Sequence, residues 1–256
     1  MFKSEKDKYE IGIALGGGGA RGFAHLGILQ ALEEKGIKPD AIAGVSAGAI
    51  AGAFIAAGHS PKEAFDFIKD YKFTAISEFN IPKTGLLSSS KMKSRLLKKI
   101  STEKLEDLEI PLVICVSNML DGKPEYLTEG PLADIVQASA SIPVLFSPVK
   151  LNGKLYSDGG IFDNVPVKPL KKACKKVIGV SISPIQKVEE LTSLIQVSTR
   201  MFQLAVNPSN AELEKQCDLF IEPPALCDYD IMDTKHAQEI FDIGYDYVKE
   251  MDIDLN

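Results

Sequence analysis

The sequence predicts a three-layer α/β/α fold with a mainly parallel central sheet, built as a single domain over residues 1–256. Near the N terminus, two units of strand, short loop and helix follow each other directly. Two later β-branched runs, residues 112–116 and 177–182, are typical of strands buried in the centre of such a sheet. Successive βα units with short loops place their strands in parallel and their helices on the sheet faces. No repeat, low-complexity tract or linker interrupts the chain, and residues 1–9 are expected to form a flexible N-terminal segment.

The first βα unit is expected to contain a buried strand at residues 11–15, a glycine loop at residues 16–19 and a helix at residues 21–35. Gly36 and Pro39 follow that helix, as is common beyond a helix C terminus. Large apolar side chains recur through it with a helical period, at Phe23, Leu26, Leu29 and Leu32.

The second unit is expected to contain a strand at residues 41–45 and an alanine-rich helix at residues 49–57. Residues 41–58 carry no charge, which raises the alternative of a membrane-spanning helix. Alanine and glycine fill most of this stretch, so insertion into a bilayer would gain little free energy. We therefore interpret it as a strand, a glycine-flanked turn and a closely packed helix.

Further along, residues 131–141 and 234–250 are expected to be helical. Asn152 and Gly153 give the strongest hairpin signal, because Asn-Gly suits a type I′ turn between short strands. Residues 73–87 are the least regular part of the chain and are where the substrate pocket is expected to be shaped. Residues 91–99 form a basic amphipathic stretch, interpreted either as contact with an anionic lipid surface or as a peripheral helix with a solvated basic face.

The composition is that of an ordinary globular protein with an acidic balance. The formal net charge of -6 and the pI near 5.3 argue against a nucleic-acid partner, which needs a concentrated basic face. The charged N terminus has no secretory h-region, so a cytoplasmic location is expected, with peripheral contact at the inner membrane face as an extension. The four cysteines have no metal-ligand spacing, and no metal site is expected.

The strongest chemical signal is the G-x-S-x-G pentapeptide from Gly44 to Gly48, with Ser46 at its centre. It lies between the predicted strand at residues 41–45 and the helix that follows. A sharp strand-to-helix turn exposes a serine hydroxyl, and small flanking residues leave room for the tight backbone. Ser46 is therefore the candidate nucleophile.

The glycine loop from Gly17 to Gly22 satisfies G-x-G-x-x-G, which raises the alternative of a dinucleotide-binding turn. That fingerprint expects an acidic residue near the end of the second strand, whereas Asp40 lies at its start. Backbone amides of such a loop can equally stabilise an oxyanion, which is favoured beside the serine turn.

A serine needs a base, and the three histidines are weak candidates for it. Ser46, Asp158 and His236 follow the α/β-hydrolase order, but His236 falls in the C-terminal helical pattern. His25 lies in the first helix and His59 beside a turn. The remaining candidate is Asp158, followed by Gly159 and Gly160, which allow close approach of substrate or backbone.

These motifs together resemble the patatin-like phospholipase family, and the resemblance covers most of the chain. The family's glycine-rich motif is similar to Gly17–Gly22, its nucleophile turn to Gly44–Gly48, and its Asp-Gly-Gly motif to Asp158–Gly160. The connecting residues 20–27 and 159–166 are similar as well. Three motifs in order are much more specific than any one of them.

The resemblance implies a serine acyl hydrolase, a lipase, phospholipase A or lysophospholipase-type esterase, acting on an acyl-ester lipid without metal or cofactor. It implies a Ser46–Asp158 dyad, an oxyanion hole formed by the amides of Gly17, Gly18 and Gly19, and a role for Arg21 in orienting that loop or a substrate phosphate. Motif-supporting positions are Gly22, Gly44, Gly48, Gly159 and Gly160. Aspartate is intrinsically a weaker base than histidine by about 3.5 kcal/mol. We therefore expect burial to raise the pKa of Asp158.

Two other function classes stay open at this point. A dinucleotide-dependent oxidoreductase would bind its cofactor through the glycine loop. A catalytically silent lipid-binding protein would bind vesicles without reacting at Ser46. The sequence indicates no oligomeric state.

Overall fold

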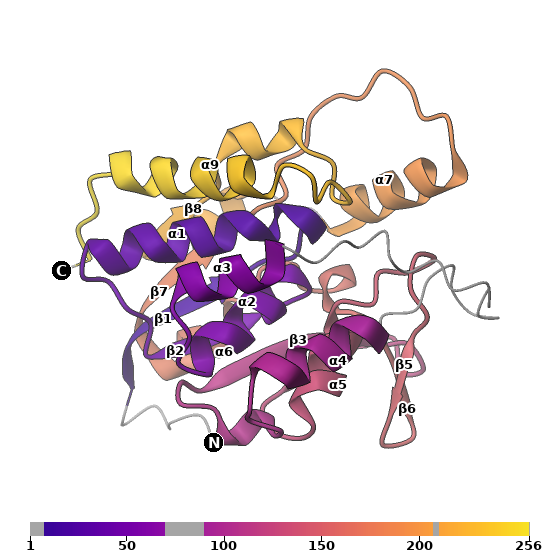
Figure 1. Cartoon of the computed structure of the whole chain (residues 1–256), viewed down its shortest axis with the longest axis horizontal. Coiled ribbons are helices and arrows are strands. Elements are labelled where there is room, and N and C mark those ends of the chain that lie inside the picture. Colours follow the sequence, from indigo (N-terminus) through magenta and orange to yellow (C-terminus); the bar gives the residue numbers. More distant parts are fainter. Residues whose placement is uncertain (1–7, 70–89, 207–209, 256) are drawn as a thin grey trace.

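The computed structural model describes residues 8–69, 90–206 and 210–255. Within these residues, one eight-stranded sheet has the order β5-β6-β3-β2-β1-β7-β8, with β4 also paired to β3. Helices cover both faces of this sheet, and α9 lies along α1 (Figure 1). The predicted α/β/α fold with a mainly parallel sheet is confirmed.

The parallel part of the sheet brings two functional loops to one edge. Leu15 pairs with Gly44 and with Val180, and Gly44 pairs with Ile114, so neighbouring strands end at the same level. The glycine loop after Leu15 and the serine turn after Gly44 therefore emerge side by side. The parallel strands are β1 (Tyr9–Leu15), β2 (Ala41–Gly44), β3 (Leu112–Asn118), β7 (Cys174–Val180) and β8 (Leu219–Ile221).

Antiparallel strands extend the sheet beyond β3 and carry Asp158 to the same edge. The predicted hairpin is confirmed, with Asn152 and Gly153 at φ values of 49° and 79°, as a type I′ turn requires. Its second strand runs against β3, so that Asp158 lies opposite Val116. The antiparallel strands are β4 (Lys123–Leu127), β5 (Val149–Leu151) and β6 (Lys154–Asp158).

Alternating side chains along the strands divide the core between the two faces. Ile13, Ile42 and Ile178 point to the larger face, whereas Ala14, Ala43, Val113 and Val177 point to the smaller one. The larger face packs against α1 (Phe23–Glu34), α2 (Ala47–Ala56), α3 (Pro61–Lys69), α4 (Ser90–Lys99), α5 (Leu132–Ser139) and α9 (Ala237–Glu250). The smaller face packs against α6 (Lys168–Ala173) and α8 (Asn210–Glu214).

Most element boundaries differ from the sequence prediction by a few residues, and three of the differences are informative. The first helix begins at Phe23 because residues Gly19–Gly22 form a 3-10 turn, η1. The last helix begins at Ala237, because residues before it form tight turns such as Asp233 to Asp230. Tyr9 belongs to β1, where it pairs with Cys174, rather than to the N-terminal segment that was expected to be flexible.

The irregular segment at residues 73–87 lies outside the described residues. The basic stretch at residues 91–99 lies within α4, where Leu96 is buried and Lys93 forms an ion pair of 2.6 Å with Asp134 of α5. Across the described ranges, no helix is both long enough and apolar enough to cross a bilayer. The alternative of a membrane span at residues 41–58 is therefore wrong, and this stretch is β2, the serine turn and α2.

Candidate active site

Ser46 occupies a strained turn between β2 and α2. Its backbone has φ 53° and ψ -120°, a region that residues with a side chain rarely adopt, and the residue is 4% exposed. The turn needs glycine on both sides because a Cβ on Gly48 would lie 2.0 Å from the Leu15 carbonyl oxygen. A Cβ on Gly44 would lie 2.7 Å from the carbonyl oxygen of Gly48. The predicted sharp strand-to-helix turn is confirmed.

Hydrogen bonds hold this strained turn in place. The Ser46 amide donates to the Ser139 hydroxyl oxygen at 2.9 Å, and that hydroxyl donates to the Cys115 carbonyl at 2.7 Å. The Val45 amide donates to the Leu15 carbonyl at 3.1 Å. Backbone strain persists only where surrounding contacts over-determine it, and these bonds supply that constraint.

Asp158 is the last residue of β6 and is completely buried. Its amide donates to the Ser141 carbonyl at 2.9 Å, and its own carbonyl accepts from the Ser117 hydroxyl at 2.7 Å. The Oδ1 atom accepts a hydrogen bond of 2.9 Å from the Gly160 amide. Gly159 lets the chain turn tightly, because a Cβ there would lie 2.2 Å from the Cys115 carbonyl oxygen. The carboxylate is therefore fixed at the carboxyl edge of the sheet, beside the serine turn.

Burial raises the pKa of Asp158 to about 7, as the sequence analysis expected. The Ser46 hydroxyl and the Gly160 amide both act on the carboxylate and lower its pKa, but by less than burial raises it. The Oδ2 atom is buried and has no hydrogen-bond partner within the described residues. The Ser46 hydroxyl is thus close enough to influence Asp158 without bonding to Oδ2. The carboxylate has a base strength close to that of histidine.

The glycine loop lies over Ser46, but its amides are not equivalent. The Gly17 amide donates to the Asn164 carbonyl at 3.1 Å, and the Ala20 amide donates to the Ile231 carbonyl at 2.7 Å. In the described part of the chain, no acceptor bonds the amides of Gly18 or Gly19. Of the three amides predicted for an oxyanion hole, the Gly17 amide is already engaged. Two remain available for a ligand.

Arg21 holds the glycine loop against the C-terminal part of the chain. Its guanidinium donates to the carbonyls of Tyr229 at 2.7 Å, Pro184 at 3.1 Å and Cys227 at 3.4 Å. Desolvation by burial lowers the pKa of Arg21 from its ordinary value. All three contacts are to backbone oxygens, so this geometry supports an orienting role for Arg21 rather than contact with a substrate phosphate.

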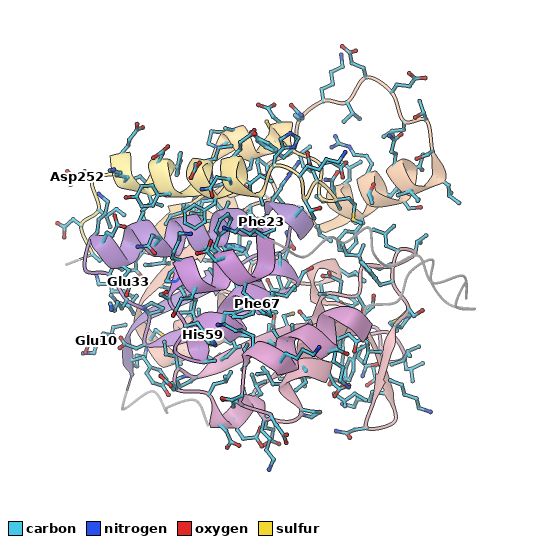
Figure 2. The ribbon with its side chains drawn as sticks, viewed as in Figure 1. Glu10, Phe23, Glu33, His59, Phe67 and Asp252 are labelled. Carbon is cyan, nitrogen blue, oxygen red and sulfur yellow. The ribbon has the colours of Figure 1, made fainter. Side chains whose placement is uncertain are left out.

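The three histidines do not line the pocket around Ser46. His25 is fully buried and bonds through Nε2 to the Gly16 carbonyl at 2.7 Å, where it supports the glycine loop from beneath. Burial lowers the pKa of His25 to about 4, so it is neutral at pH 7. His59 packs against Phe54 beside Phe67 (Figure 2). His236 pairs through Nδ1 with Asp233 at 2.6 Å.

A narrow pocket opens over Ser46 and Asp158. The pocket brings together the candidate nucleophile Ser46, the Asp158 carboxylate and the residues Gly18 and Gly19. It is also lined by side chains that the sequence did not indicate. Of these, Asn164 follows the Asp-Gly-Gly motif closely enough to have been a candidate. The lining residues are Gly17, Gly18, Gly19, Ser46, Ile142, Asp158, Asn164, Ser183, Phe202, Gln203, Val206 and Ile231.

Two alternative ligand sites find no support in the described residues. Among the described residues, no three histidine, cysteine or acidic side chains are grouped so that they could hold a metal ion. Asp40, which a ribose would require at the glycine loop, instead accepts a hydrogen bond of 3.0 Å from the Ile11 amide at the start of β1. That position is at the opposite edge of the sheet from the loop.

The fold and the family resemblance agree with comparisons to known proteins. A family model described as patatin-like phospholipase matches residues 13–171, which is more than half of the chain. A lysophospholipase NTE1 from Candida glabrata is 27% identical over 93% of this chain and 16% of its own length. An uncharacterized NTE family protein from Mycobacterium tuberculosis is 34% identical over 62% of this chain and 45% of its own length. The chain thus spans less than half the length of these two curated relatives.

Two solved structures share the fold at low sequence identity. VipD from Legionella pneumophila has a TM-score of 0.61 and 16% identity, covering 94% of this chain and 66% of that one. Human GIVD cytosolic phospholipase A2, in complex with methyl gamma-linolenyl fluorophosphonate, has a TM-score of 0.51 and 12% identity. It covers 96% of this chain and 57% of that one.

Proposed function

Because the chain belongs to the patatin-like phospholipase family, we propose that it is a serine acyl hydrolase that cleaves an ester of a lipid through an acyl-enzyme on Ser46. The single observation that carries this proposal is the pairing of two features at one edge of the sheet. A strained serine turn lies there beside a buried carboxylate with a pKa near 7. Gly18 and Gly19, whose amides have no acceptor among the described residues, line the same pocket.

In the first half of the reaction, Ser46 Oγ attacks the ester carbonyl carbon and its proton passes to Asp158. The carbonyl electron pair moves to the oxygen, where the amides of Gly18 and Gly19 stabilise the negative charge. The bond to the alcohol then breaks, and Asp158 returns the proton to the leaving oxygen. An acyl ester of Ser46 remains.

In the second half, water attacks the acyl carbon and gives its proton to Asp158. The same amides hold the second tetrahedral oxyanion, the bond to Ser46 Oγ breaks, and the serine regains its proton. Each of these steps uses Asp158 first as base and then as acid, which suits a group whose pKa is near neutral pH. No proton transfer in this scheme requires a histidine.

The test is covalent labelling with a fluorophosphonate together with hydrolysis of a soluble short-chain ester. We expect the wild type to be labelled and active, Ser46→Ala to be unlabelled, and Asp158→Asn to lose about 10⁴-fold in kcat. Ser141→Ala serves as a folded control, because that hydroxyl donates only to the Gln137 carbonyl. An unlabelled, inactive wild type would reject the proposal.

The acyl chain has a candidate site beside the nucleophile. A second, small pocket shares Gly19 with the first and includes Ala47, which follows Ser46. Its lining is apolar, consisting of Gly19, Ala20, Gly22, Phe23, Leu26, Ala47, Ile50, Ala51 and Ile68. Each methylene buried there would contribute about 0.8 kcal/mol.

An ester chain-length series tests this placement. Ile50→Phe should lower kcat/KM for long acyl chains much more than for short ones. Ile37→Phe, in a separate pocket near His59, is the matched control and should leave the chain-length profile unchanged. An identical profile in all three proteins would place the acyl chain elsewhere.

The contact with a lipid surface is proposed at α7 (Leu194–Val206) rather than at α4. The inner side of α7 contributes Phe202, Gln203 and Val206 to the pocket. Its outer side exposes a stripe of apolar residues, with Leu194 73% and Met201 63% exposed. An amphipathic surface of this kind lies in a bilayer interface, and here it would bring the pocket to the substrate.

Co-sedimentation with zwitterionic vesicles tests the role of α7. Leu194→Gln/Met201→Gln should weaken vesicle binding, whereas the apolar exchange Leu194→Met/Met201→Leu should preserve it. Both proteins should hydrolyse the soluble ester normally. Unchanged vesicle binding of the glutamine variant would refute a lipid contact at α7.

The other two function classes make different predictions. A dinucleotide-dependent oxidoreductase should bind its cofactor in a titration, yet the position of Asp40 leaves the glycine loop without its ribose partner. A silent lipid-binding protein should bind vesicles while resisting the fluorophosphonate. The Ser46 hydroxyl lies close enough to the Asp158 carboxylate to affect its pKa, and this placement favours the hydrolase.

A further inference from the structure

Asn164 is a buried polar residue in the pocket whose side chain has no hydrogen-bond partner among the described residues. It is only 6% exposed, and it lines the pocket together with Ser46 and Asp158. Its backbone is engaged, because its carbonyl accepts the Gly17 amide at 3.1 Å. The carboxamide is not among the fully buried polar atoms that lack a partner, so its polar atoms reach the pocket, where a ligand can pair with them.

The orientation of the carboxamide follows from the glycines around it. The Oδ1 atom lies 2.6 Å from where a Cβ on Gly17 would be and 2.9 Å from the corresponding point on Gly160. The Nδ2 atom is not among the nearest neighbours of a Cβ on either glycine. The oxygen is therefore turned toward the two glycine backbones, and the NH2 group is turned away from them.

The same glycine positions also place Asn164 next to the reacting groups. A Cβ on Gly17 would lie 3.3 Å from the Ser46 Cβ, and a Cβ on Gly160 would lie 3.0 Å from Asp158 Oδ1. Asn164 is thus adjacent to the nucleophile on one side and to the carboxylate on the other. A neutral donor at this position can stabilise negative charge in the pocket without adding a charge that would compete with Asp158.

We propose that Asn164 contacts the substrate, with its side-chain NH2 group donating a hydrogen bond to the ester oxygen that becomes the oxyanion. This assignment rests on the proposed hydrolase function and deepens it. With the Gly17 amide bonded to the Asn164 backbone, the oxyanion hole consists of the amides of Gly18 and Gly19 and the carboxamide of Asn164. Asn164 then positions the glycine loop through its backbone carbonyl and completes the oxyanion hole through its side-chain NH2 group.

Two substitutions separate these two contributions. Asn164→Ala and Asn164→Asp both keep the backbone carbonyl that holds Gly17, but both remove the NH2 donor. Asn164→Asp also keeps the size of the side chain, so it tests the chemistry without the cavity that Asn164→Ala leaves. The expected loss in kcat is about 10²-fold or more for each variant, with KM for a short soluble ester changed by less than about threefold.

Two further readouts distinguish a substrate contact from a merely structural role. A trifluoromethyl ketone, which forms a tetrahedral adduct with serine, should lose affinity in proportion to kcat in both variants. In Asn164→Asp, the added carboxylate should also move the lower limb of the pH-rate profile to higher pH, because like charges raise the pKa of Asp158. The end point of fluorophosphonate labelling counts folded active sites and corrects for any loss of protein.

Asn118→Ala is the matched control, because Asn118 is also a buried asparagine but bonds to Asp121 and Glu125 within the β3–β4 turn. It should lower thermal stability while leaving kcat per labelled site unchanged. If both Asn164 variants keep kcat and ketone affinity within about threefold of a wild type that depends on Ser46, the inference about Asn164 is wrong and the hydrolase proposal stands. A wild type that neither labels nor hydrolyses esters would overturn both.

Discussion

The amide of Ser46 donates a 2.9 Å hydrogen bond to the hydroxyl of Ser139, a residue 93 positions away in the chain. That hydroxyl in turn donates to the Cys115 carbonyl on β3. One side chain of α5 thereby connects the strained serine turn to the centre of the sheet. The position of the nucleophile depends on it.

Ser139→Ala should leave the buried Ser46 amide without its acceptor. We expect a loss of about 1–3 kcal/mol in the free energy of unfolding and a fall in kcat, because the strained backbone of Ser46 would relax. Urea unfolding and ester hydrolysis measure the two effects. Ser141→Ala, near the end of the same helix, should change neither by a comparable amount, and equal effects of both substitutions would contradict the assignment.

The pH dependence of hydrolysis should follow Asp158. Because the carboxyl must be ionised to accept the proton of Ser46, kcat/KM should rise with pH and level off above about pH 7. His236→Ala should keep this limb, since His236 is paired with Asp233 outside the pocket. A limb that disappears in His236→Ala would make histidine the base and remove Asp158 from that role.

Two buried groups should influence acid stability in opposite directions. The pKa of His25 is about 4 in the folded protein, below the ordinary value of 6.5, so protonation of the unfolded chain destabilises the fold as pH falls from 6.5 to 4. The pKa of Asp158 is about 7, above the ordinary value of 3.8, so its protonation stabilises the fold as pH falls from 7 to 4. Each effect amounts to about 3–4 kcal/mol, so the two largely cancel in the wild type.

Replacing His25 or Asp158 should reveal how the other group contributes to stability at acid pH. Relative to the wild type, Asp158→Asn should lose stability as pH falls from 6.5 to 4, and His25→Gln should gain it. Urea unfolding at intervals of one pH unit measures the difference curves. Parallel curves for all three proteins would mean that neither group titrates as its burial indicates.

Gly48 and Gly52 lie one turn apart on α2 but should respond very differently to alanine. A Cβ on Gly48 would overlap the Leu15 carbonyl oxygen at 2.0 Å, so Gly48→Ala should displace the serine turn and abolish fluorophosphonate labelling. The nearest neighbours of a Cβ on Gly52 are all side-chain atoms, of Ile42 at 3.1 Å, Leu112 at 3.2 Å and Leu15 at 3.7 Å. Gly52→Ala should stay within about 1 kcal/mol of the wild type, because alanine favours the helix. Comparable labelling of both variants would show that the turn tolerates the clash.

The sequence predicted the local geometry of Ser46 and Asp158 well, because motif residues act through local geometry. A serine between two glycines, after a strand and before a helix, has few conformations available, and the structure has the expected turn. The burial of Asp158 was also foreseeable, since β6 follows an Asn-Gly hairpin against a central strand. The helix α1 ends at Glu34, and Gly36 follows it with a φ of 79°, in the left-handed region that its position indicated.

Long-range contacts could not be predicted in the same way. The engagement of the Gly17 amide depends on a carbonyl of Asn164, and the support of the Ser46 amide depends on Ser139. Neither pairing leaves a pattern in the sequence. Elements of few residues, such as β8 and α6, were missed because they span too little chain to show a period. The apolar stripe on the outer side of α7 becomes apparent only when the structure shows which side of this helix lines the pocket.

The bonds that Arg21 makes have a consequence for where an active fragment of this chain can end. The match to the family model stops at residue 171, yet Arg21 is held by carbonyls of Pro184, Cys227 and Tyr229. The Ala20 amide likewise needs the carbonyl of Ile231. A fragment truncated after residue 171 would keep Ser46 and Asp158 but release the glycine loop that we propose stabilises the oxyanion. The smallest active fragment is therefore expected to include residues well beyond the three motifs, because the C-terminal third of the chain holds the glycine loop in place.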